Sequence, residues 1–151
     1  MFGLAIAVAA PAVSAQEAPK SGHIIFDAYV TNRIVQSVDM GIDKGIITES
    51  DGFDKLVNGI APFDVLTFRC VQQEQFADQK WINGSGSCMK ADKDGDHIFY
   101  TWDKTGWTFV GGTGKFKGIT GKGAAKPIYY HDSGAQGWEL IARHEGDWAI
   151  K

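Results

Sequence analysis

Four histidines, His23, His97, His131 and His144, are the side chains best suited to acid–base chemistry or metal binding near neutral pH. Their spacing contains no HExxH or other close metal-ligand pair, so no metal site is predicted. We expect His131 and His144 to share one face of a sheet with Tyr129. There they would transfer protons, bind the polar end of a ligand, or form a polar rim. No G-x-S-x-G segment supports a serine nucleophile, and no catalytic residue is assigned.

A glycine-rich stretch, Val110–Gly121, resembles a phosphate-binding loop in its glycine content. A P-loop needs Ser or Thr after its lysine and a helix behind it. Here Phe116 follows Lys115, and the next segment has the pattern of a strand. A Rossmann motif also fails, because the third glycine is displaced to Gly118. The stretch is therefore interpreted as a tight turn between strands, and no cofactor is predicted.

The segment Asp92–Asp96 (DKDGD) resembles the opening of a calcium-binding EF-hand loop. The sixth position of such a loop should be glycine, and here it is His97. The flanking residues have strand character, so a hairpin tip rich in turn-forming residues is favoured. A weak surface Ca²⁺ site is the remaining alternative.

Composition indicates one globular domain of short strands and tight turns. The chain has 151 residues, 44% of them hydrophobic and 22% charged, with 19 glycines and five tryptophans. Its net charge of -3 is spread along the sequence. Nucleic acid is not expected as a partner, because phosphate binding requires a basic stripe.

The first 15 residues are apolar and end in Val13-Ser14-Ala15, which fits a signal peptide cleaved before Gln16. Residues 16–21 form a flexible leader, and residues 22–151 form the folded domain. The mature protein is expected to be periplasmic or secreted, with no membrane segment. Cys70 and Cys88 are then expected to form a disulfide.

From residue 64 onward, short β-rich runs alternate with turn signals, which is typical of an all-β meander closed as a barrel or folded as a sandwich. The predicted strands are 23–30, 45–48, 65–75, 80–91, 97–102, 107–110, 115–120, 125–131, 138–144 and 147–150. Residues 49–63 have helical spacing and predict a short helix or a loop.

Hairpin parity predicts which side chains share a face. The predicted cross-strand pairs are Trp102–Trp107, Tyr100–Phe109, Phe109–Phe116, Trp107–Gly118, Tyr129–Trp138 and His131–Gln136. The aromatic side chains then face inward, and Gly118 leaves room for an indole. The same parity places Cys70 inside and Cys88 outside, so a disulfide needs a bulge at Gly84 or Gly86.

The stretch Trp107–Gly121 (WTFVGGTGKFKGITG), together with Asp92–Asp96 and Trp102, resembles the glycine-rich turn and following strand of the allene oxide cyclase and dirigent barrels. The resemblance covers about a third of the chain. It implies a single eight-stranded antiparallel β-barrel of the calycin type, with a mostly apolar cavity and often an oligomeric state. In plants, this family guides cyclisation or coupling of reactive apolar intermediates. None of its catalytic positions is carried over to this chain.

The leading hypothesis is an exported barrel that binds a small apolar or aromatic molecule. The candidate ligand-binding residues are Tyr100, Trp102, Trp107, Tyr129, His131, Trp138 and His144. One alternative is an isomerase or cyclase that uses Tyr129, His131 or His144 as proton carrier. Another is a structural barrel, such as a homo-oligomer subunit, with a filled core.

Overall fold

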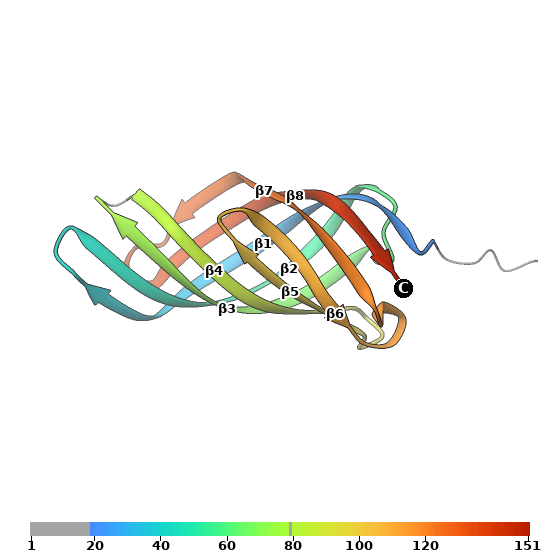
Figure 1. The fold of residues 1–151 in the computed structure, drawn as a ribbon. Helices are drawn as coiled ribbons and strands as arrows, with labels where there is room; N and C mark the ends of the chain where they lie inside the picture. Colours follow the sequence, from blue (N-terminus) through green and yellow to red (C-terminus); the bar gives the residue numbers. More distant parts are fainter. Residues whose placement is uncertain (1–18, 79) are drawn as a thin grey trace, which may run out of the picture.

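The protein is a single closed antiparallel barrel in which each strand pairs with its sequence neighbour and β8 closes on β1 (Figure 1). The structure is a computed structural model that describes residues 19–78 and 80–151. Its eight strands are β1 (Ser21–Asp39), β2 (Asp43–Gly59), β3 (Val65–Ala77), β4 (Lys80–Ala91), β5 (His97–Asp103), β6 (Gly106–Gly112), β7 (Ile119–Asp132) and β8 (Gly137–Ile150). Short 3₁₀ turns η1 (Gly114–Phe116) and η2 (Gly134–Gln136) precede β7 and β8. The predicted eight-stranded antiparallel barrel is confirmed. The predicted signal peptide and residues 16–18 of the predicted leader lie outside the described residues.

The helix or loop predicted for residues 49–63 is wrong, because most of this segment is the second half of β2. Asp54 is fully buried, while Phe53 is largely exposed. This alternation belongs to a strand whose one face lines the barrel. The apolar residues at helical spacing lie on both faces of this strand, with Leu56 on the inner face and Phe53 and Val57 on the outer face. Their spacing therefore did not indicate a helix.

The two ends of the barrel differ. We call one end the mouth; there the β1–β2, β3–β4 and β7–β8 hairpins turn. The other end, the base, holds the start of β1, the end of β8 and the remaining long connections (Figure 1). The β5–β6 hairpin is shorter than its neighbours, since β5 and β6 have only 7 residues each.

The basal half is packed with apolar side chains. Phe26 makes edge-on contacts with Phe63 and Trp107, and Trp107 lies 4.8 Å from Phe109 between ring centroids. The other large buried apolar residues there are Ile24, Leu66, Phe68, Ile98, Phe116, Ile119 and Trp148. Packing of this kind leaves no room for a ligand in the base.

Trp107 is accommodated by glycines, as predicted, but not by Gly118. A Cβ atom at Gly123 or at Gly146 would lie 2.7 Å from the indole. Gly118 instead faces the carbonyl of Lys151 and has φ +80°. The predicted pairs Trp107–Gly118 and Phe109–Phe116 are wrong because η1 occupies the start of the predicted strand. Trp107 pairs with Gly123, and the pair Trp102–Trp107 is confirmed.

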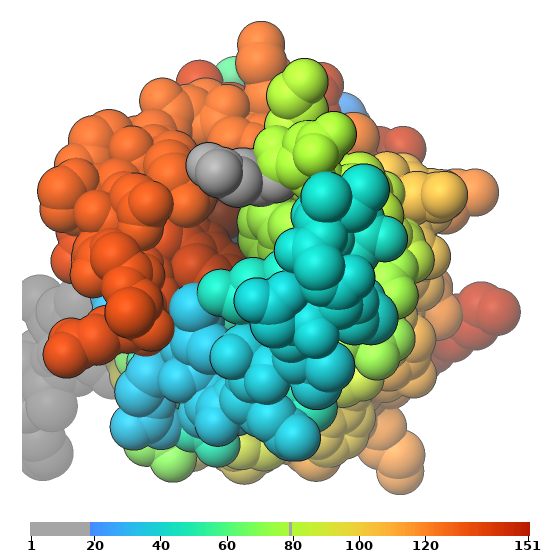
Figure 2. All heavy atoms as spheres, turned by 90° about the vertical axis from the view of Figure 1, so that its left-hand side faces the viewer, coloured from blue at the N-terminus to red at the C-terminus, as the bar shows by residue number. Residues whose placement is uncertain are grey.

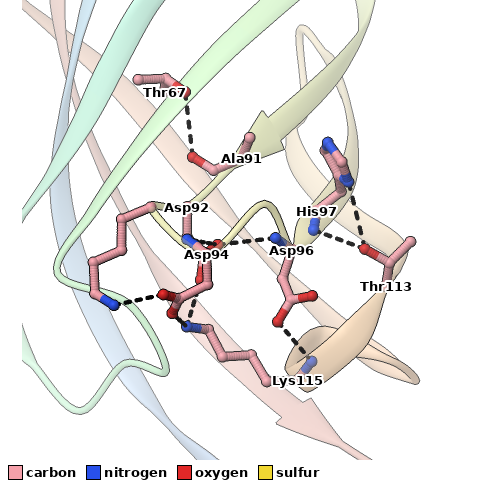
Figure 3. Close-up of polar contacts among 9 residues, drawn as sticks. Thr67, Ala91, Asp92, Asp94, Asp96, His97, Thr113 and Lys115 are labelled. Atoms are coloured by element: carbon pink, nitrogen blue, oxygen red, sulfur yellow. Dashed lines mark hydrogen bonds and ion pairs between the residues drawn. The ribbon is translucent and has the colours of Figure 1, made fainter.

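At the base, residues of the glycine-rich stretch bind the loop Asp92–Asp96 (Figure 3). Asp92 Oδ1 accepts the backbone N–H groups of Asp94 and Asp96, each at 2.9 Å. The carboxylates of Asp92 and Asp94 both pair with the Lys115 ammonium. Asp96 accepts the backbone N–H of Lys115 at 3.1 Å and lies where a Cβ of Gly114 would stand. The carboxylates considered for Ca²⁺ thus bind a lysine and backbone amides.

The Cys70–Cys88 disulfide is present. The two cysteines are direct cross-strand partners, and Cys88 pairs with Tyr100 on the inner face. The prediction that Cys88 points outward is wrong because the β4–β5 connection is a five-residue loop, Asp92–Asp96, which places Cys88 opposite Tyr100. The bulge in this hairpin lies nearer the mouth, between Gln75 and Phe76, so it does not affect the bridge.

Candidate ligand-binding site

The mouth end of the barrel is hollowed at its centre. Figure 2 shows this end with β1 and β2 on one side, β3 and β4 on another, and β7 and β8 opposite them. The hollow lies between these three hairpins, above the packed base. A barrel of eight strands is just wide enough to hold one small ligand where side chains do not fill it. The mouth is therefore the candidate site.

Trp102 forms part of the inner wall on the β4–β5 side. Its position depends on Gly84 and Gly86, because a Cβ atom at Gly86 would lie 2.4 Å from the indole nitrogen. The Trp102 indole N–H donates to Gln72 Oε1 at 3.2 Å. The Gly84–Ser87 segment is part of strand β4, and its two glycines leave room for the Trp102 indole.

A belt of hydrogen-bonded side chains separates the mouth from the base. Gln72 Nε2 donates to Asn32 Oδ1 at 2.6 Å and to Ser50 Oγ at 2.8 Å. The Ser50 hydroxyl donates to the same Asn32 oxygen at 2.5 Å. All three side chains are buried. We call Asn32, Ser50, Gln72 and the Trp102 indole the polar belt; its mutual bonds fix each donor and acceptor in place.

Glu74 lies on β3 one inward position nearer the mouth than the belt. It is only 7% exposed, and its register partners are Ile46 on β2 and Gly84 on β4. Burial raises the pKa of the Glu74 carboxyl to about 7, although a hydrogen bond from the Trp81 side chain opposes the shift. Near neutral pH this group therefore exists in both its charged and its neutral form.

Aromatic side chains lie near Glu74 at the mouth, although Trp81 and Tyr130 are themselves 43% and 59% exposed. Trp81 pairs with Phe76 across the β3–β4 hairpin and donates to the carboxyl. Burial, followed by the negative charges of Asp132 and Glu74, raises the pKa of the Tyr130 hydroxyl, which places Tyr130 near the carboxyl. Trp138 pairs with Asp132 and with Asn32 of the belt, so it lies on the same inner surface. The site combines aromatic walls with one buried carboxyl group.

Tyr129 and His131 lie on the outer surface. Tyr129 pairs with Ile141 and His131 with Glu139, not with Trp138 and Gln136 as predicted. The error arises because η2 lengthens the β7–β8 connection, so that Asp132 rather than Tyr129 pairs with Trp138. Neither side chain faces the hollow.

His144 faces inward but lies in the packed base. Its ring stacks on Phe26 with centroids 4.7 Å apart. Burial, and next the Lys90 charge, lowers the pKa of His144 to about 3, so the ring is neutral. Lys90 forms a buried ion pair with Asp54 beside it. These groups lie below the polar belt, away from the mouth.

The seven residues predicted to contact a ligand therefore separate into three sets. Trp102 and Trp138 line the mouth. Tyr100, Trp107 and His144 belong to the packed base, and Tyr129 and His131 are outside. Sequence reasoning missed Glu74, Gln72, Trp81 and Tyr130. A signal for the first two existed, since Leu66, Phe68, Cys70, Gln72 and Glu74 alternate without interruption on one face of β3.

A depression of about 910 Å³ lies around the β5–β6 hairpin, where Gln72 and Trp102 of the polar belt line it together with outward-facing residues of β3 to β7. Its lining includes small hydroxyl side chains: Ser85, Ser87, Thr101, Thr105 and Thr108. The depression contains no buried charge, so the mouth is chemically the more specific site.

Within residues 19–78 and 80–151, no three His, Cys, Asp or Glu side chains lie together as metal ligands. No helix in the same residues has the length and apolar character needed to cross a membrane.

Comparison of the sequence finds no matching family model and no matching curated relative. Comparison of the structure finds the pterocarpan synthase dirigent protein PsPTS1, with a TM-score of 0.56 and 16% identity over 90% of this chain and 99% of the other. The pterocarpan synthase dirigent protein GePTS1 matches with a TM-score of 0.53 and 17% identity, over 97% of this chain and 100% of the GePTS1 chain. At this identity, the likeness concerns the fold alone. The chain therefore has the fold of the dirigent and allene oxide cyclase barrels, as the glycine-rich motif predicted.

Proposed function

We propose that this protein is an exported barrel that binds a small, mostly apolar aromatic molecule in its mouth. The observation that supports the proposal most directly is the contrast between the two halves of the barrel. The base is filled by large side chains, whereas the mouth is hollowed and walled by aromatic residues around a buried carboxyl. Concave apolar sites with a few fixed polar groups are typical of small-ligand binding.

Two further observations support the proposal. The structurally similar proteins are described as pterocarpan synthases, which is a precedent for small-molecule chemistry in this fold. The Cys70–Cys88 disulfide fits an oxidising compartment, in line with the predicted signal peptide.

Catalysis is the second candidate, and one group favours it. A carboxyl with a pKa of about 7 can give or take a proton near neutral pH. An isomerase or cyclase in this barrel would then use Glu74 as proton carrier. Tyr129 and His131 point away from the site, and His144 lies beneath the polar belt.

The five tryptophans allow a direct test. In ¹⁵N-labelled protein titrated with 2-naphthol as probe, we expect the indole N–H signals of Trp81, Trp102 and Trp138 to shift. The signals of Trp107 and Trp148 should stay in place, because both are buried in the base. Single Trp→Phe variants assign the signals. Equal shifts at all five positions, or none at the three mouth tryptophans, would refute binding in the mouth.

A further inference from the structure

Glu74 is a buried acid without a basic partner. Three acidic residues in the described part of the chain are buried: Asp27, Asp54 and Glu74. Asp27 accepts two hydrogen bonds from Arg143, at 2.8 and 2.9 Å, and Asp54 pairs with Lys90. Among the described residues, Glu74 forms no ion pair, and the Trp81 side chain is its hydrogen-bond donor. A buried carboxylate without a counter-ion is costly, which indicates that a further group completes the site.

The base of the same barrel shows what such a group can be. The Lys90 ammonium there pairs with Asp54 and lies 4.4 Å from the Tyr100 ring centroid. It also lies 5.1 Å from the centroids of Phe26 and Phe68. The protein thus already stabilises one buried cation with one carboxylate and several aromatic faces. The mouth repeats the carboxylate and the aromatic residues, but no ion pair between Glu74 and a lysine is found among the described residues.

Charges around the mouth favour a cationic ligand. The ionisable side chains at its turns and on the nearby inner faces are Asp39, Asp43, Lys44, Asp78, Lys80, Tyr130 and Asp132. Acidic groups outnumber basic ones there, even before Glu74 is counted. An acidic opening with apolar walls raises the local concentration of cations. Lys44 lies opposite Phe76, two residues from the partner of Glu74 on β2, but it is exposed and pairs with no carboxylate among the described residues.

We propose that the mouth binds an organic cation, an ammonium group attached to an aromatic body, with the Glu74 carboxylate as its counter-ion and Trp81, Tyr130 and Trp138 around it. This inference rests on the proposed ligand-binding function and narrows the class of ligand. The cation replaces the missing basic partner of Glu74, and the aromatic walls bind both the charge and the ligand's ring.

A pair of probes with one shape separates charge from size. Phenyltrimethylammonium and tert-butylbenzene have nearly the same volume and differ by one charge. At about pH 8 we expect the cation to bind the wild-type protein at least about tenfold more tightly than the neutral probe, as measured by calorimetry and by the mouth indole signals. Glu74→Gln should abolish this preference. Glu139→Gln should preserve it, because Glu139 carries the same charge at the mouth end but faces outward with His131.

Wild-type protein provides a second measurement that does not depend on a variant. Because only the ionised carboxyl attracts the cation, its affinity should fall by up to about tenfold between about pH 8 and pH 6, while that of tert-butylbenzene stays constant. Equal binding of the two probes, or an unchanged preference in Glu74→Gln, overturns the inference. If 2-naphthol binds in the mouth while the cation shows no preference, the proposed function holds and the cationic ligand is excluded. If none of the three probes binds, both proposals fail.

Discussion

Replacing Lys90 with methionine removes the charge of the buried ion pair while keeping most of the side-chain volume. Both partners are essentially inaccessible, with Asp54 at 0% and Lys90 at 2% exposure. In the variant, Asp54 keeps a buried carboxylate whose Oδ1 has no hydrogen-bond partner even in the wild type. Removing one member of a buried pair typically costs about 3–5 kcal/mol. We expect this loss of unfolding free energy near neutral pH, a large share of the ~5–15 kcal/mol available to a domain.

The cost should depend on pH in a defined direction. Burial raises the pKa of Asp54, and Lys90 opposes the shift. In Lys90→Met only burial acts on the pKa of Asp54. The folded state therefore keeps a proton on the Asp54 carboxyl, whereas the unfolded state releases this proton above about pH 4. The folded variant then binds more protons, and the destabilisation relative to wild type shrinks as the pH falls from about 7 towards 4. His144 acts in the same direction, because Lys90 is one of the two causes of its lowered pKa.

Urea denaturation followed by tryptophan fluorescence measures this cost at about pH 7 and pH 5 with the disulfide intact. The double variant Asp54→Asn/Lys90→Met is the control, because it removes both charges and should regain most of the lost stability. A cost below about 1 kcal/mol that does not change with pH would show that the pair contributes nothing, and the reasoning would be wrong.

Two other substitutions test the packing and the covalent bridge. Gly123→Ala places a Cβ 2.0 Å from a backbone carbonyl and 2.7 Å from Trp107, so a loss of about 3 kcal/mol or more is expected in thermal unfolding. Gly45→Ala is the control, since its nearest neighbour is 3.9 Å away; equal melting temperatures for the two variants would disprove the close contact. Replacing Cys70 and Cys88 together by serine opens a loop of sequence separation 18 and should cost about 3 kcal/mol in urea denaturation. An unchanged midpoint would mean that the bridge does not stabilise the folded state.

Much of the fold was predictable because the barrel follows local rules. Alternating apolar residues and turn dipeptides identify the strands, and the parity of the tight turn at Asp103–Gly106 gives the Trp102–Trp107 pair. Parity fails where a connection is not a simple turn. The 3₁₀ turn η1 delays the start of β7 to Ile119, and η2 changes the pairing of β7 with β8, so that Trp138 lies opposite Asp132. The residue count between two strands does not reveal such a turn, because its hydrogen bonds depend on contacts made elsewhere. Lys115, for instance, is held by carboxylates of another loop.

The candidate site was harder to predict than the fold. Hairpin parity placed Trp102 and Trp138 inside, through a correct pair for Trp102 and through a wrong pair, with Tyr129, for Trp138. Glu74 has no distinctive local sequence. Its buried state depends on Trp81, Tyr130 and a glycine at position 84, which come from β4 and β7. Sequence can show that Glu74 lies on the inner face of β3. Whether a basic residue lies opposite depends on the closed barrel as a whole.

The division of the barrel into a packed base and a hollowed mouth explains how the chain can tolerate a buried acid without a partner. The disulfide, the hydrophobic core and the Asp54–Lys90 pair all lie below the polar belt or at its level. Each side chain of the polar belt forms a hydrogen bond with another member of the belt. These bonds hold the inner wall in place and do not involve Glu74. Stability therefore comes mainly from one half of the molecule. The other half is free to keep Glu74 uncompensated, as a binding site for a counter-ion requires. A lysine opposite Glu74 would make the fold more stable and would fill the position that we assign to the ligand.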